Sequence, residues 1–110
     1  MSQRVISHLP KLKTLVKLAP RKRRDQLEKA NLQFIKSIVE CVENVMTGNL
    51  KLKRQCMDKL KKYKTILRKI FNSENKLKVK KEIIVQNGGA FLPALLAPVI
   101  TILAEQLLRR

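Results

Sequence analysis

The sequence predicts an all-α protein, a small helical bundle centred on an antiparallel helical hairpin and followed by an apolar C-terminal helical tail. Apolar residues between 35 and 46 recur three or four apart, and the same spacing returns between residues 56 and 71. This spacing gives a helix one apolar face. The break between the two runs, Thr47-Gly48-Asn49, is short. We therefore expect the two helices to pack antiparallel, within a chain of 110 residues that has room for one small domain.

Four helices are predicted before residue 75. A short helix follows Pro10, and its apolar residues are Leu12, Leu15, Val16 and Leu18. A second begins at Pro20 and ends near Ala30, because proline is well tolerated in a first turn. Asn31 is a good N-cap for the third, which ends before Gly48. The fourth runs for about five turns, and its apolar residues are Cys56, Leu60, Tyr63, Leu67, Ile70 and Phe71.

The chain divides into three parts by composition. Residues 1–30 form basic N-terminal helices, residues 31–87 form the hairpin and a basic segment, and residues 88–110 form a Gly-Gly hinge with the apolar tail. Within the basic segment, residues 76–81 read KLKVKK. This alternation suits an edge strand as well as a helix, so the sequence leaves the conformation of that segment open.

The charge balance predicts a polyanionic partner. The chain has 25 Lys and Arg against 8 Asp and Glu, a net charge of +17. Such an excess repels itself in a compact state unless anions neutralise it. The chain has no Trp and few other aromatic residues, so few side chains are available to stack on nucleic-acid bases. Contact with phosphate groups is therefore the favoured interaction.

The positive charge gathers on the outer face of the fourth helix. From Asn49 to Lys81 there are 13 basic residues and two acids, whereas ordinary exposed helices place a Glu about four residues before a Lys. A smaller cluster follows Pro20 and also suits nuclear localisation; for both clusters the alternative is a solvated surface. The predicted nucleic-acid-binding residues are Arg21, Lys22, Arg23, Arg24, Lys51, Lys53, Arg54, Lys61, Lys62, Lys64, Arg68, Lys69, Lys76, Lys78, Lys80 and Lys81.

This surface predicts binding without sequence selectivity. Lysines favour the nucleic-acid backbone, and no helix carries a pattern of Asn, Gln and Arg that would read base edges. Double-stranded DNA is the favoured ligand, with RNA left open. An enzyme is not expected, because His8 stands alone, Cys41 and Cys56 have no base nearby in sequence, and no phosphate loop or carboxylate pair occurs. No metal site and no cofactor are predicted.

The C-terminal tail is apolar. No charge occurs from Ile83 to Ala104, but the 15 residues from 90 to 104 contain Pro93 and Pro98 and are shorter than the span of about 20 residues that a membrane helix needs. Pro98 should kink the tail. The tail could cover the hairpin, form a homo-oligomer interface, or insert into a membrane surface, and membrane activity is the alternative function. The residues expected to make these contacts are Phe91, Leu92, Leu95, Leu96, Val99, Ile100 and Leu103.

A Gly-Gly pair separates the basic and apolar parts. Paired glycines supply a helix stop and a hinge. The segment QNGGA followed by FLPALLAP resembles the maturation sites in precursors of the small basic core peptide of adenoviruses. In that family a viral cysteine protease cuts after Gly-Gly when Gln, Asn or an aliphatic residue stands four places before the cut. The resemblance implies cleavage between Gly89 and Ala90, with Gln86 and Gly88 as the other processing residues.

A wider resemblance runs from about Leu27 onwards. Asn44-Val45 with Gly48-Asn49, then Leu67-Arg68-Lys69-Ile70, then Val85 to Pro98 are similar to the motifs of small proteins of adintoviruses and the related Maverick or polinton elements. The resemblance implies a virion core protein that packages or condenses the genome beside a capsid, with passage through the host nucleus during assembly. The chain departs from the adenoviral peptide in being rich in Lys more than in Arg.

Overall fold

Helices account for most of residues 3–108, the part of the chain that the computed structural model describes. The elements are α1 (Gln3–Ser7), α2 (Leu9–Lys17), α3 (Pro20–Lys29), α4 (Leu32–Met46), α5 (Arg54–Leu60), the 3₁₀ helix η1 (Lys61–Tyr63), α6 (Lys64–Phe71) and α7 (Leu77–Leu108). No strand occurs within this range. The predicted all-α class is confirmed, and the edge strand considered for residues 76–81 is wrong, because residues 77–81 begin α7.

Local end signals set the boundaries that were predicted. The Asn31 side chain accepts a hydrogen bond from the backbone N–H of Phe34 at 2.9 Å and caps α4. Pro20 occupies the first position of α3. After α4, Gly48 has a φ of +79°, a left-handed conformation that glycine adopts without a Cβ clash. These three signals act over a few residues, so they can be found in the sequence.

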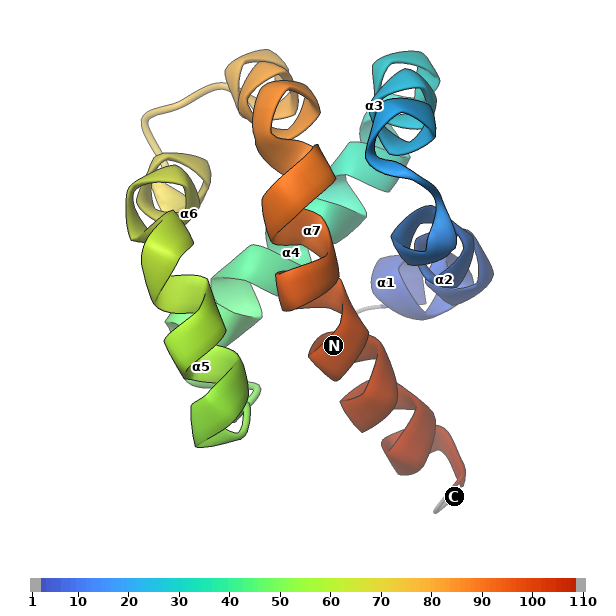
Figure 1. The fold of residues 1–110 in the computed structure, drawn as a ribbon, viewed down its shortest axis with the longest axis vertical. Coiled ribbons are helices and arrows are strands. Elements are labelled where there is room, and N and C mark those ends of the chain that lie inside the picture. The colour runs from blue at the N-terminus through green and yellow to red at the C-terminus, as the bar shows by residue number, and fades with distance from the viewer. Residues whose placement is uncertain (1–2, 109–110) are drawn as a thin grey trace.

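α7 is the centre of the fold (Figure 1). In this view it contacts α2 and α3 on one side, α5 and α6 on the other, and α4, which crosses behind it. Its apolar residues surround the helix, as expected for a helix enclosed by others. Buried in α7 are Lys80, Ile84, Gly88, Phe91, Leu92, Leu95, Leu96, Val99, Ile100 and Leu103. The apolar tail therefore covers the apolar faces of the other helices, which was one of its three predicted roles.

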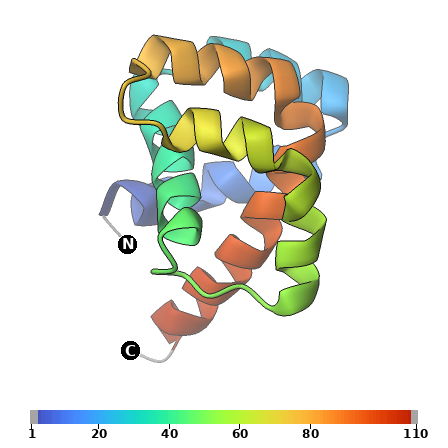
Figure 2. The same cartoon turned by 90° about the vertical axis from the view of Figure 1, so that its left-hand side faces the viewer.

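The predicted hairpin needs correction. α4 packs on α6, but the expected single five-turn helix is interrupted by η1, and α5 runs in a different direction from α6 (Figure 2). The interruption lets Leu60 at the end of α5 and Leu67 and Ile70 in α6 all reach the core. A hairpin of two helices is thus replaced by shorter helices arranged around α7.

The path of α7 also differs from prediction. The helix is continuous through Gly88 and Gly89, so the expected stop at this pair is wrong. Figure 2 shows α7 changing direction between its first and second parts. We attribute the bend to Gly88-Gly89 and Pro93, because Pro93 cannot donate the hydrogen bond that would close the turn on the carbonyl of Gly89.

Candidate nucleic-acid interface

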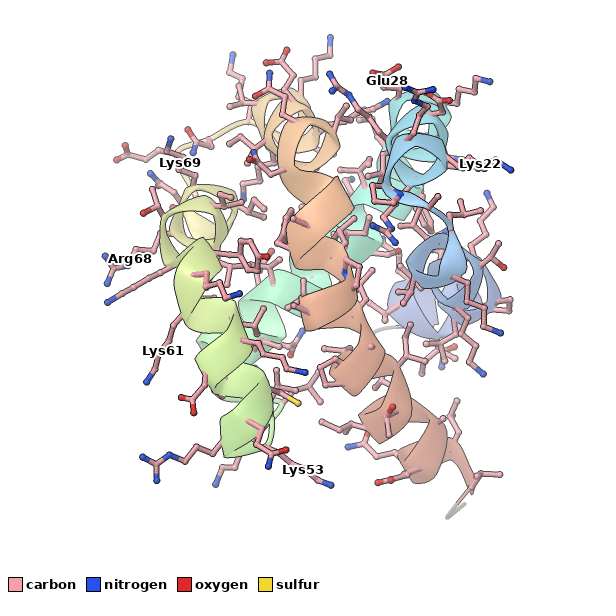
Figure 3. All side chains as sticks on the ribbon, in the orientation of Figure 1. Lys22, Glu28, Lys53, Lys61, Arg68 and Lys69 are labelled. Carbon is pink, nitrogen blue, oxygen red and sulfur yellow. The ribbon has the colours of Figure 1, made fainter. Side chains whose placement is uncertain are left out.

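The α5–α6 basic face consists of exposed cations on the outer side of α5, η1 and α6 and on the segment just before α5. They are Lys51, Lys53, Arg54, Lys59, Lys61, Lys62, Lys64, Arg68 and Lys69. In Figure 3, Lys61, Arg68 and Lys69 point away from α7. Because Leu60, Leu67 and Ile70 are buried on the inner side, helical geometry directs the basic residues outward. All predicted binding residues from 51 to 69 are exposed.

Carboxylates neutralise little of this charge. Asp58 is the one acid in the sequence between residues 51 and 69. It pairs with Lys61 at 3.1 Å, but the Lys61 side chain is 76% exposed and the Asp58 side chain 53%. Exposed pairs of this kind are weak. The remaining cations of the face lack any ion pair within the described residues, so their charge is available to an external anion.

The lysines that follow α6 do not act as one group. Lys76 and Lys78 are exposed beside the start of α7. Lys80, in contrast, is 9% exposed, and Lys81 donates a hydrogen bond from Nζ to the carbonyl oxygen of Ala30 at 2.8 Å, at the end of α3. Lys80 is therefore removed from the predicted interface, and Lys81 has a structural role that competes with phosphate binding.

A second set of cations covers the opposite side of the protein and is named here the α2–α3 basic surface. Its exposed cations are Lys11, Lys13, Lys17, Arg21, Lys22, Arg24 and Lys29. Asp25 and Glu28 oppose them, and Glu28 pairs with Arg24 at 3.6 Å. Residues 21–24 were predicted to bind nucleic acid, whereas the cations of α2 were not. The signal was present, because Lys11, Lys13 and Lys17 alternate with the buried Leu12 and Leu15.

Arg23 does not belong to either surface, which corrects the prediction. It is 4% exposed, and its guanidinium donates hydrogen bonds to the carbonyl oxygens of Leu15, Val16, Leu18 and Gly89 at distances between 2.5 and 3.1 Å. Burial lowers the pKa of Arg23 from its ordinary value. With its donors turned to the backbone, this guanidinium is not available to phosphate.

The predicted processing residues lie in α7. Gln86 and Ala90 are exposed, but Gly88 is buried. A Cβ at Gly88 would lie 2.8 Å from Leu27 Cδ1, and one at Gly89 would lie 3.3 Å from Pro20 Cβ. The two glycines thus let α7 approach α3 closely. In the folded chain the pair is helical and packed against α3, and the predicted hinge stays a prediction.

Two of the remaining reactive side chains, Cys41 and His8, lie in structural surroundings. Burial, with the neighbouring Glu40 as a second cause, raises the pKa of the Cys41 thiol to about 12, while Cys56 is half-buried. His8 Nδ1 lies 2.8 Å from both Ser37 Oγ and the carbonyl oxygen of Arg4. Over residues 3–108 no group of three His, Cys, Asp or Glu side chains is placed to hold a metal ion.

The apolar tail buries its predicted contact residues, while Leu107 and Leu108 near the end of α7 are exposed. By length and composition, α7 is the one helix of the described chain that could cross a membrane, and a buried core helix meets the same criterion. The seven residues predicted to contact a membrane or an oligomer partner are all buried among the other helices. They are therefore core residues in this structure.

Fold and surface together define a small all-α protein with two exposed basic surfaces. Comparisons of the chain with protein-family models, with curated proteins and with solved structures give no match. The function must then be inferred from the charge and geometry of the residues themselves.

Proposed function

We propose that this protein binds double-stranded DNA without sequence selectivity through the α5–α6 basic face. The observation that carries the proposal is a surface of nine exposed cations with Asp58 as its one acid. Because surface cations of one sign repel each other, a polyanion that neutralises them stabilises the complex. Seven of the nine are lysines, which contact phosphates as point charges and carry little information about base sequence.

The binding energy should come from release of counterions. Each phosphate neutralised on duplex DNA contributes about −0.9 to the slope of log K against log salt. If about six of the nine cations touch phosphates at once, the slope is about −5. Affinity should therefore fall by more than a hundredfold between about 50 and 200 mM salt.

The biological role we propose is that of a virion core protein that packages or condenses a DNA genome. The resemblance to small proteins of adintoviruses and polintons supports this role. The proposed binding to phosphates agrees with it, since packaged genomes include every sequence. A capsid protein and packaging ATPase encoded beside this gene would support the assignment, and a neighbourhood without virion genes would contradict it.

The binding proposal is tested by comparing two variants of equal net charge. The first changes Lys61, Lys62, Lys64 and Arg68 to Gln, and the second changes Lys13, Lys17, Arg21 and Lys22 to Gln. Fluorescence anisotropy with two unrelated duplexes at several salt concentrations gives the affinity and the salt slope. The first variant should bind a single duplex at least tenfold more weakly, with a slope smaller in magnitude by about 3, and the second should change binding less.

Two results would overturn the proposal. Affinity that differs strongly between the two unrelated duplexes would contradict binding to the backbone. Equal losses in the two variants would show that overall charge, and not the α5–α6 basic face, determines binding.

A further inference from the structure

We infer that the α2–α3 basic surface is a second DNA site, so that one molecule can hold two duplexes side by side. The inference rests on the proposed function, since it takes the α5–α6 basic face as the first site. It adds a bridging activity that the first site alone does not supply.

The two basic surfaces face in opposite directions. In Figure 1, α5 and α6 lie on one side of α7, and α2 and α3 lie on the other; Figure 2, turned by 90°, places α5 and α6 in front and α2 and α3 behind. In Figure 3, Lys22 and Arg68 point outward on opposite sides. The protein measures 26 Å along the axis that separates the two surfaces in Figure 1.

The second surface has enough unpaired charge to attract a duplex. It carries seven exposed cations against Asp25 and Glu28, and the Arg24–Glu28 pair at 3.6 Å is more than half exposed on both side chains. Such a pair is too weak to remove the cation from binding. The surface is therefore net positive in its own right, although less so than the α5–α6 basic face.

One duplex cannot contact both basic surfaces of the same molecule. Duplex DNA has a persistence length of about 50 nm, far greater than the 26 Å width of the protein. A short duplex bound to α5 and α6 would have to bend sharply to reach α2 and α3. The second surface therefore stays free when the first is occupied, and a second duplex is the polyanion that can neutralise it.

The fold holds the two sites at a fixed separation. Arg23 joins the end of α2, through Leu15, Val16 and Leu18, to Gly89 in α7. α7 in turn contacts α5 and α6. Two duplexes bound to opposite sides would thus be kept at a fixed spacing, which is the geometry of a bridge and not of a flexible tether.

The test is a capture assay with the full chain. A biotinylated 30-base-pair duplex on beads is incubated with the protein and with a fluorescent duplex of unrelated sequence, and sedimentation at the same concentration establishes whether the protein is monomeric. The variant with Lys13, Lys17, Arg21 and Lys22 changed to Gln should bind the beads within about threefold of the unmodified protein. It should capture at least tenfold less fluorescent duplex. A charge-retaining variant, with Lys13→Arg, Lys17→Arg, Arg21→Lys and Lys22→Arg, should capture the normal amount.

The outcomes separate the inference from the proposed function. If the unmodified protein binds the beads but captures no second duplex, or if the Gln variant captures the normal amount, the bridging inference is wrong and the first site stands. Capture that requires a dimer and is unaffected by the Gln changes also overturns it. If the unmodified protein does not bind the beads at all, the proposed function itself fails.

Discussion

Arg23 donates a hydrogen bond from Nη1 to the carbonyl oxygen of Gly89 at 2.5 Å, and Gly89 stands four residues before Pro93. Proline has no N–H, so within α7 the Gly89 carbonyl lacks its usual helical donor. The guanidinium supplies one from another helix. Its other bonds go to the carbonyl oxygens of Leu15, Val16 and Leu18 at the end of α2. A helix end leaves carbonyls without helical donors, although Leu15 also accepts from the backbone N–H of Leu18. One side chain from α3 thereby completes the backbone bonding of two other helices.

Replacing Arg23 should therefore destabilise the fold. We expect Arg23→Met to lower the free energy of unfolding by about 3 kcal/mol, because several buried carbonyls lose their donors. Urea denaturation followed by circular dichroism measures this change. Arg24→Met is the matched control, since Arg24 is exposed and pairs with the exposed Glu28, and it should cost less than about 1 kcal/mol. Equal losses would contradict the structural role of Arg23.

Gly88 should be required for the close packing of α7 on α3. A Cβ at Gly88 meets the ends of the Leu27 and Leu92 side chains at 2.8 and 2.9 Å, which can shift for an alanine but not for a larger group. We expect Gly88→Val to destabilise the protein by about 2 kcal/mol, as measured by thermal unfolding. Ala90→Val, at an exposed position two residues on in the same helix, should cost about 0.5 kcal/mol. Similar costs at both positions would indicate that Gly88 is not a packing residue.

The local features of the fold were predicted from the sequence more fully than its long-range contacts were. The Asn31 cap, the Gly48 turn and the apolar face of α4 depend on nearby residues, and all three are present. The position of the tail was harder to predict, because a run of apolar residues suits a core, an oligomer interface and a membrane equally well. The position of the tail depends on how well α2 to α6 pack around α7. That packing depends on residues far apart in the sequence.

The candidate site was also predicted only in part from the sequence. Cations on the α5–α6 basic face were predicted from their spacing relative to buried residues, but Arg23 and Lys80 were included by charge alone. Arg23 lies four residues before the buried Leu27, and Lys80 lies four before the buried Ile84. Spacing alone does not identify buried cations, because the exposed Lys11 stands in the same relation to the buried Leu15.

Removing the tail should unfold the protein instead of releasing an independent basic domain. A chain that ends at Asn87 lacks seven buried apolar side chains from Phe91 to Leu103. Their burial contributes on the order of 10–20 kcal/mol, as much as the whole stability of a typical domain. The truncated chain should show no cooperative thermal transition and narrow dispersion of its amide proton signals. A cooperative transition in the truncated chain would show that residues 3–87 fold alone.

Cleavage between Gly89 and Ala90 should depend on local unfolding. A protease channel binds an extended substrate, whereas this bond lies in a helix and Arg23 holds the Gly89 carbonyl. We expect an adenovirus-type protease to cut the folded chain slowly and to cut the Arg23→Met variant at least tenfold faster, as followed by intact mass. Equal rates for the two proteins would mean that the Arg23 contact does not protect the site. Fragments from another bond would contradict the processing assignment itself.

The two cysteines should differ in reactivity. Cys41 is fully buried and its thiol pKa is raised to about 12, mainly by burial, whereas Cys56 is half-buried in α5. The thiolate is the reactive form, so at pH 8 a chromogenic disulfide reagent should label one thiol per chain in the native protein and two in urea. Cys56→Ser should abolish the native reaction. Rapid labelling of Cys41 in the folded Cys56→Ser variant would contradict its burial.

The same pKa shift should make stability depend on pH. In the unfolded chain the Cys41 thiol ionises near its ordinary pKa of 9.0, while in the folded chain it stays protonated until about pH 12. Between these values the unfolded state binds fewer protons, so the contribution of Cys41 to stability is present below pH 9 and lost as the pH rises, with a slope of up to about 1.4 kcal/mol per pH unit. Urea denaturation at pH 8, 9 and 10 measures the loss, and Cys41→Ala, although less stable, should show a shallower decline. Identical slopes in the two proteins would show that Cys41 does not remain protonated in the core.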